Sequence, residues 1–194
     1  MKPFIVAINA ISGGGKTTAT RELQKRISNS KALYFDDRNY DSDSGIEDTC
    51  EWIEAGADVN LWDLRRLADD IEKLKKENLD FIFLDYPFGY RHKIIGPYLD
   101  YSIFIDTPLD VAMARRILRE YDEKIITDIK DVLADMKHYL ERGRNAYLFG
   151  LDSVRESADF LVDGSLSVGE IVERISEKIM SVASGKLNPK QGQI

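Results

Sequence analysis

The feature that most constrains the fold of this chain is a strand, a glycine loop and a helix that follow one another near the amino terminus. Residues 4–8 read Phe-Ile-Val-Ala-Ile, a fully apolar run typical of a strand buried on both faces. Three consecutive glycines follow shortly after it, and the apolar residues Ala19, Leu23 and Ile27 then recur at helical spacing. This order predicts one unit of an α/β fold.

The loop itself, Ala-Ile-Ser-Gly-Gly-Gly-Lys-Thr over residues 10–17, fits the Walker A phosphate-binding pattern from its sixth position onward. Ala10 stands where the first glycine is usual, and its methyl group is small. Glycines let backbone N–H groups turn toward phosphates, Lys16 supplies a charge for the β and γ groups, and Thr17 offers a hydroxyl to Mg²⁺. The sequence therefore predicts binding of ATP and Mg²⁺ by Ser12, Gly13, Gly14, Gly15, Lys16, Thr17 and Thr18.

The rest of the chain continues the alternation. Further apolar runs at residues 32–35, 81–84, 101–105 and 158–162 predict four more strands. Helical patterns cover residues 61–74, with Asn60 as the expected N-cap, and residues 107–121, 129–140 and 167–179. We expect an α/β fold of the P-loop NTPase type with three layers. Its sheet has about five mostly parallel strands, helices cover both faces, and ligands bind at the carboxyl ends of the strands.

Length and composition limit the other possibilities. We expect one domain over residues 1–183 of the 194, followed by a frayed tail over residues 184–194. Cys50 is the only cysteine, which excludes an internal disulfide, and the apolar run at residues 4–8 is too short for a signal peptide or a membrane span. These features predict a cytoplasmic protein with no membrane partner, and they leave a homo-oligomer open.

Charge is distributed unevenly along the chain. The net charge is -7, which disfavours a nucleic-acid partner because such a surface needs clustered basic residues. Residues 36–59 are polar, acidic and weakly patterned, and Arg38 is their only basic residue. A long irregular insertion in a compact domain is usually functional or mobile. We therefore expect residues 36–59 to border the site of the phosphate acceptor.

A carboxylate at the end of a neighbouring strand completes the expected metal site. Asp85 follows the buried run at residues 81–84, where a Walker B carboxylate reaches Mg²⁺ directly or through water; a turn cap is the other interpretation. The chain has neither the Asn-Lys-x-Asp base reader nor the Asp-x-x-Gly switch of a GTPase. It also lacks the size and extra modules expected of an ATP-driven machine, so a kinase is favoured.

Three stretches resemble the uridine kinase and phosphoribulokinase group, which includes the nicotinamide riboside kinases. They are Ser-Gly-Gly-Gly-Lys-Thr-Thr at residues 12–18, Phe-Asp-Asp at 35–37, and Ile-Asp-Thr-Pro-Leu-Asp at 105–110 leading into Ala-Arg-Arg-Ile-Leu-Arg-Glu at 114–120. The resemblance covers roughly residues 3–120. Asp85-Tyr-Pro stands where uridine kinases more often have Glu-Gly, a departure that bears on the acceptor.

The resemblance implies a general base after the second strand. Unchanged spacing from Lys16 selects Asp36, whereas an aromatic residue three places later selects Asp37, followed by Tyr40. Such a carboxylate can orient an acceptor hydroxyl and take its proton. We prefer Asp36 and keep Asp37 as the alternative.

The resemblance also implies a mobile lid over residues 115–145. In such kinases, arginines of the lid close on the phosphates and compensate transition-state charge. The corresponding residues here are Arg115, Arg116 and Arg119, for which a solvated basic helix face is the other interpretation.

The identity of the acceptor is the part of the function that the sequence determines least. Tyr40 and Arg91 are candidate acceptor contacts, and an ordinary solvated charge is the other interpretation of Arg91. Trp52 and Trp62 either stack on an acceptor base or belong to the core. Because a phosphorylated acceptor needs arginines and residues 36–59 hold only Arg38, we expect a neutral or cationic acceptor such as a nucleoside or riboside. A nucleoside monophosphate kinase, a sugar kinase and a non-catalytic ATP-binding regulator are the alternatives.

Overall fold

The computed structural model describes residues 2–36, 40, 46–121 and 128–187. Within these residues five strands form one sheet in the order β2-β3-β1-β4-β5, and each neighbouring pair is parallel. The strands are β1 (Phe4–Asn9), β2 (Ser30–Tyr34), β3 (Phe81–Asp85), β4 (Tyr101–Asp106) and β5 (Phe160–Asp163). The expected five-stranded α/β fold is confirmed, and the sheet is parallel throughout.

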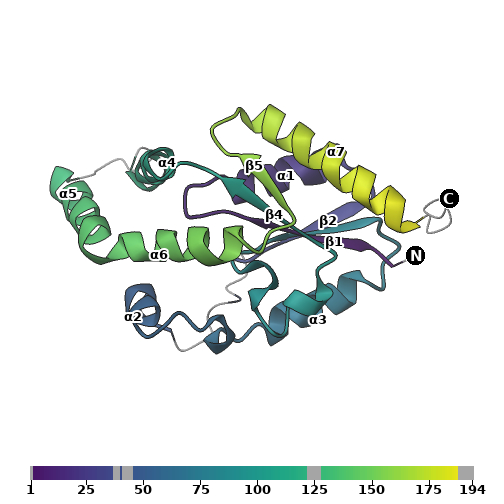
Figure 1. The fold of residues 1–194 in the computed structure, drawn as a ribbon, viewed down its shortest axis with the longest axis horizontal. Coiled ribbons are helices and arrows are strands. Elements are labelled where there is room, and N and C mark those ends of the chain that lie inside the picture. The colour runs from purple at the N-terminus through teal and green to yellow at the C-terminus, as the bar shows by residue number, and fades with distance from the viewer. Residues whose placement is uncertain (1, 37–39, 41–45, 122–127, 188–194) are drawn as a thin grey trace.

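Helices cover both faces of the sheet, as Figure 1 shows. Phe4, Val6 and Ile8 of β1 pack with α1 (Lys16–Arg26) and α7 (Val168–Leu187), whereas Ile5 and Ala7 pack on the side of α3 (Arg65–Leu74). This division follows from the strand repeat of two, which sends successive side chains to opposite faces. Apolar residues throughout β1 are therefore required, because neither face meets water.

Two expectations about element ends were wrong. Asn60 does not cap a helix over residues 61–74: its backbone N–H donates to Asp58 Oδ1 at 2.9 Å, which starts the 3₁₀ turn η1 (Val59–Leu61), and α3 begins only at Arg65. The carboxyl-terminal helix is longer than expected and includes residues 184–187, where Ser184 Oγ donates to the Met180 carbonyl. A capping box starts that helix: the Ser167 N–H donates to Glu170 Oε2 at 3.1 Å, and the Glu170 N–H donates to Ser167 Oγ at 3.3 Å.

Residues 129–155 form one helical segment, here named the arm. It consists of α5 (Ile129–His138), the π-helical turn η4 (Tyr139–Gly143), α6 (Arg144–Phe149) and the π-helical turn η5 (Gly150–Arg155). The arm lies beside the sheet and runs over the short helix α2 (Thr49–Glu54) (Figure 1). The arm continues beyond residue 145, where the lid was expected to end.

Shorter elements complete the fold. Helix α4 (Leu109–Tyr121) follows β4 as predicted, and the 3₁₀ turns η2 (Gly89–Arg91) and η3 (Gly96–Tyr98) follow β3. None of the helices in the described part of the chain combines the length and the apolar character that a membrane crossing requires.

Candidate functional site

The glycine loop lies between β1 and α1, and its backbone is held closely on two sides. Gly13 has a φ of 75°, and a Cβ at this position would lie 2.1 Å from the carbonyl oxygen of Ala112 in α4. A Cβ on Gly14 would lie 2.7 Å from the Ala10 Cβ. The methyl group of Ala10 is thus accommodated because Gly14 has no side chain. Thr107 adds a tether by donating from its hydroxyl to the Gly14 carbonyl at 2.9 Å.

Sheet order brings two carboxylates to this loop. β3 lies between β1 and β2, and Asp85 is in register with Ile8 of β1 and with Tyr34 of β2. Asp36 follows β2 by two residues, so both carboxylates stand at the carboxyl edge beside the loop. Lys16 Nζ lies 3.2 Å from Asp36 Oδ2 and 3.3 Å from Asp85 Oδ1. Residues separated widely in sequence thereby form one charged cluster.

Asp85 is the buried member of the cluster. Its exposed fraction is 2%, and its Oδ2 accepts a hydrogen bond from Thr17 Oγ1 at 2.6 Å. Burial raises the pKa of Asp85, while the Lys16 ammonium and the Thr17 hydroxyl oppose that rise. Asp85 Oδ1 accepts no hydrogen bond from the described residues, although the Lys16 ammonium lies near it. A buried carboxylate oxygen of this kind, next to a threonine hydroxyl, fits Mg²⁺, a cation that prefers one or two protein oxygens together with phosphates and water.

The cluster opens into a cleft of about 810 Å³, which is large enough for a nucleotide and a small acceptor. The cleft has two chemically different ends. One is lined by the glycine loop with Arg115 and Arg119 of α4, and the other by Phe35, Thr49, Trp52, Trp62, Pro87 and Phe88. The first is named here the phosphate end and the second the aromatic wall.

The structure separates the three arginines predicted for the lid. Arg115 and Arg119, one helical turn apart, both line the cleft. Arg116 Nη2 instead donates to both carboxylate oxygens of Asp135 in α5, at 2.7 and 2.9 Å, and Arg116 does not line the cleft. Arg116 therefore joins α4 to the arm.

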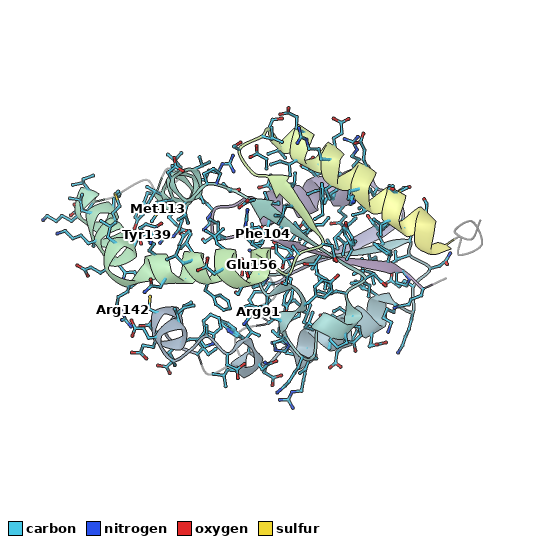
Figure 2. The ribbon with its side chains drawn as sticks, in the orientation of Figure 1. Arg91, Phe104, Met113, Tyr139, Arg142 and Glu156 are labelled. Atoms are coloured by element: carbon cyan, nitrogen blue, oxygen red, sulfur yellow. The ribbon has the colours of Figure 1, made fainter. Side chains whose placement is uncertain are left out.

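The predicted acceptor residues are placed differently from the expectation. Tyr40 is buried, and its hydroxyl donates to Asp70 of α3 at 2.9 Å. Arg91 is exposed on η2 and lies over the ring of Phe149 in α6 (Figure 2). Neither side chain lines the cleft. Asp37 lies outside the described residues.

Most of the aromatic wall was missing from the predicted site. Phe35 and Phe88 stand just after β2 and β3, and their position beyond the strand ends was the signal that could have identified them. Trp52 and Trp62 pack edge to face at 5.8 Å within an aromatic cluster, as the core interpretation predicts, and they also line the cleft. Stacking on an acceptor base stays a prediction.

The parallel sheet, the glycine loop and the carboxylates beside it define a P-loop protein of the NTPase fold class. No family model matches the chain. A curated uridine kinase from Leuconostoc citreum is 28% identical over 64% of this chain and 71% of its own length. A second from Streptococcus agalactiae is 22% identical over 93% of this chain and 96% of its own. The sequence resemblance to uridine kinases is thus confirmed.

Solved structures support the same fold. A gluconokinase from Sinorhizobium meliloti superimposes with a TM-score of 0.60 at 13% identity, covering 97% of this chain and 98% of its own. At this level of identity the similarity concerns the fold alone, which agrees with that of a P-loop kinase.

Proposed function

We propose that this protein is a Mg²⁺-dependent kinase that transfers the γ-phosphoryl group of ATP to a hydroxyl of a small neutral or cationic acceptor, a nucleoside or riboside. The observation that carries the proposal is that Lys16 lies within 3.3 Å of both Asp36 and Asp85, and that Lys16 and Asp36 line one cleft while Asp85 is buried behind them. Kinases need these three kinds of group together: a cation for the transferred phosphate, a base and a metal ligand.

Each residue has a defined task in this proposal. The loop amides and Lys16 bind the β- and γ-phosphates, and Arg115 and Arg119 face the same end of the cleft from α4. Thr17 and Asp85 would hold Mg²⁺, which supplies charge neutralisation on the phosphates when bound. Asp36, whose side chain is 69% exposed and whose Oδ2 faces the Lys16 ammonium at 3.2 Å, would accept the proton of the acceptor hydroxyl.

The aromatic wall supports the choice of acceptor. Phe35, Trp52 and Trp62 offer flat apolar surfaces, and base–aromatic stacking contributes about 1–3 kcal/mol per base. The cations in the cleft lining are Lys16, Arg21, Arg115 and Arg119, all from α1 and α4, so the aromatic wall contributes none within the described residues. Among the described residues, a monophosphate held at the aromatic wall would find no cationic side chain of the wall to pair with.

An ADP-release assay coupled to product analysis tests the proposal. The panel contains nucleosides, vitamin ribosides, sugars and nucleoside monophosphates, each with ATP and Mg²⁺. We expect the highest kcat/KM with a nucleoside or riboside. A preference for a monophosphate would contradict the acceptor class, and tight ATP binding without any phosphorylated product would contradict the kinase assignment in favour of a regulator.

A further inference from the structure

Helix α2 presents different side chains to the cleft and to the arm. Thr49 and Trp52 line the cleft, whereas Cys50 and Glu54, spaced one helical turn apart, face the arm. Six residues are too few to hold a helix in place by their own backbone hydrogen bonds. Trp52 is held on one side by its Nε1–H hydrogen bond to the Asp58 carbonyl at 2.9 Å and by the Trp62 ring, and its position depends further on what α2 is docked against.

Arg142 of the arm makes most of the polar docking contacts. Its Nε donates to Glu54 Oε1 at 2.9 Å and its Nη2 donates to Glu54 Oε2 at 3.1 Å, so the ion pair is bidentate. Its Nη1 lies 3.4 Å from Asp48 Oδ2, and Asp48 is also the N-cap of α2, accepting from the Cys50 N–H at 2.7 Å. One guanidinium thus holds both ends of α2, and Figure 2 shows Arg142 on the side of the arm toward α2.

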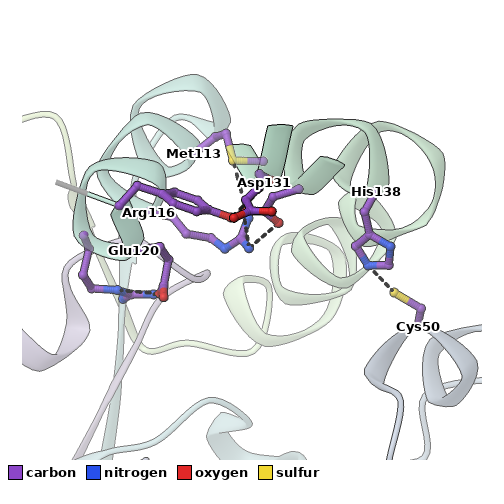
Figure 3. Close-up of polar contacts among 9 residues, drawn as sticks. Cys50, Met113, Arg116, Glu120, Asp131 and His138 are labelled. Atoms are coloured by element: carbon purple, nitrogen blue, oxygen red, sulfur yellow. Dashed lines mark hydrogen bonds and ion pairs between the residues drawn. The ribbon is translucent and has the colours of Figure 1, made fainter. Parts of the chain in front are cut away.

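Two further contacts lie beside this ion pair. Cys50 Sγ is 3.5 Å from His138 Nε2 of α5 (Figure 3), and the rings of Trp52 and Phe149 meet edge to face at 5.2 Å. The second contact places an arm residue directly behind a side chain of the aromatic wall. Together with the Arg142 ion pairs, these two contacts fix the position of α2 against the arm.

We propose that Arg142 is a positioning residue for the acceptor: it anchors α2 to the arm and so fixes Trp52 in the aromatic wall. This inference rests on the proposed function for its kinetic consequence. Arg142 itself does not line the cleft. Its loss should therefore weaken acceptor binding and leave ATP binding unchanged.

The sole cysteine provides a readout that needs no activity. Cys50 is 7% exposed and faces the arm, so a thiol reagent such as DTNB should label it only after α2 separates from the arm. Whether labelling becomes faster or slower in a variant without Arg142 distinguishes undocking of α2 from a simple loss of charge. Burial raises the pKa of the Cys50 thiol, and the Arg142 charge opposes that rise, so removing the charge without undocking α2 would slow labelling. Undocking exposes the thiol and accelerates labelling.

The test compares Arg142→Met and Glu54→Gln with the control Lys137→Met, which removes an exposed cation from the same arm. Thermal melting first establishes that each variant is folded. We expect Arg142→Met and Glu54→Gln to raise the acceptor KM by roughly five-fold with the ATP KM unchanged, and Lys137→Met to leave it unchanged. Arg142→Met should also raise the Cys50 labelling rate by roughly five-fold, and Lys137→Met should not. Labelling is compared only for these two variants, because the Glu54 charge raises the thiol pKa and its removal would speed labelling without undocking. Arg142→Lys should raise the acceptor KM less than Arg142→Met does, because lysine keeps the charge but cannot form the bidentate pair.

Two outcomes separate the failure of this inference from that of the proposed function. An active wild-type enzyme whose Arg142→Met variant shows unchanged labelling and unchanged acceptor KM overturns the positioning role, as does a rise confined to the ATP KM. A wild-type protein that phosphorylates nothing overturns the proposed function and with it the kinetic part, while faster Cys50 labelling in Arg142→Met would still establish the docking.

Discussion

The two ends of the cleft are built in different ways. The phosphate end comes mainly from one continuous stretch, residues 10–18, whose backbone conformation follows from glycine positions and close contacts such as that of Gly13 with Ala112. The aromatic wall is assembled from residues 35, 49, 52, 62, 87 and 88, which come from four separate segments. In the proposed kinase, the site of the shared cosubstrate ATP is therefore encoded locally, whereas the site of the particular acceptor depends on tertiary packing.

The largest effect is expected from Lys16→Ala at the phosphate end. Lys16 contacts both carboxylates, and its charge is required where phosphate charge develops, so kcat/KM should fall about 1,000-fold or more. The ADP-release assay measures it, with Lys25→Ala as control, since Lys25 is an exposed cation farther along α1 that pairs with Glu22. Near wild-type turnover by Lys16→Ala would place the phosphate site elsewhere.

Asp36→Asn comes next and addresses the choice between two adjacent aspartates. A general base contributes about 100- to 10,000-fold to the rate, so kcat should fall at least about 100-fold while ATP binding is kept. Asp37→Asn is the matched comparison, and we expect it to retain most activity. If Asp37→Asn loses kcat and Asp36→Asn does not, the base is Asp37.

Asp85→Asn separates metal binding from stability. We expect the Mg²⁺ concentration for half-maximal activity to rise about 10- to 100-fold, because a metal-facing carboxylate is lost. The folded protein should nevertheless be at least as stable at pH 7. Since burial raises the pKa of Asp85, its ionisation destabilises the fold as pH rises above the ordinary aspartate pKa of 3.8, and asparagine removes that cost. Thermal melts at pH 4 and pH 7 check this, and a variant less stable than wild type at pH 7 alone would contradict it.

The sequence predicted the phosphate end better than the aromatic wall, because local sequence patterns specify the first and tertiary packing assembles the second. The strands, the loop and Asp85 follow from local patterns: apolar runs, glycines and a carboxylate after a buried strand. The burial of Tyr40 and the pairing of Arg116 with Asp135 depend on where the arm and α3 lie, which no local pattern specifies. The start of α3 was missed because Asp58 competes for the Asn60 amide, a contact that capping rules alone do not rank.

Trp62→Leu addresses the aromatic wall. Stacking on an aromatic side chain contributes about 1–3 kcal/mol, so kcat/KM should fall roughly ten-fold for acceptors with a planar ring and stay unchanged for acyclic or sugar acceptors. Tyr98→Leu is a suitable control, because Tyr98 is a half-buried ring outside the cleft lining. Equal losses for ring-containing and ring-free acceptors would mean that Trp62 acts only as a core residue.

The smallest effect concerns pH, and it should distinguish the aromatic wall from the phosphate end. His92 is fully buried; its Nδ1 accepts from the Ile94 N–H at 3.2 Å, which leaves Nε2 to donate to the Trp62 carbonyl at 2.9 Å. This arrangement requires the neutral ring, and burial lowers the pKa of His92 below its ordinary 6.5.

The sign of the pH effect follows from that direction. The stability from neutral His92 is complete above pH 6.5 and is lost as pH falls through the lowered pKa, because protonation turns Nδ1 from an acceptor into a second donor facing the Ile94 N–H. Between pH 7 and pH 5 we expect the acceptor KM to rise a few-fold while the ATP KM, set mainly by backbone amides, changes less. His92→Gln keeps one donor and one acceptor but cannot titrate, so it should flatten the acceptor profile; an unchanged profile would show that another group at the site titrates instead.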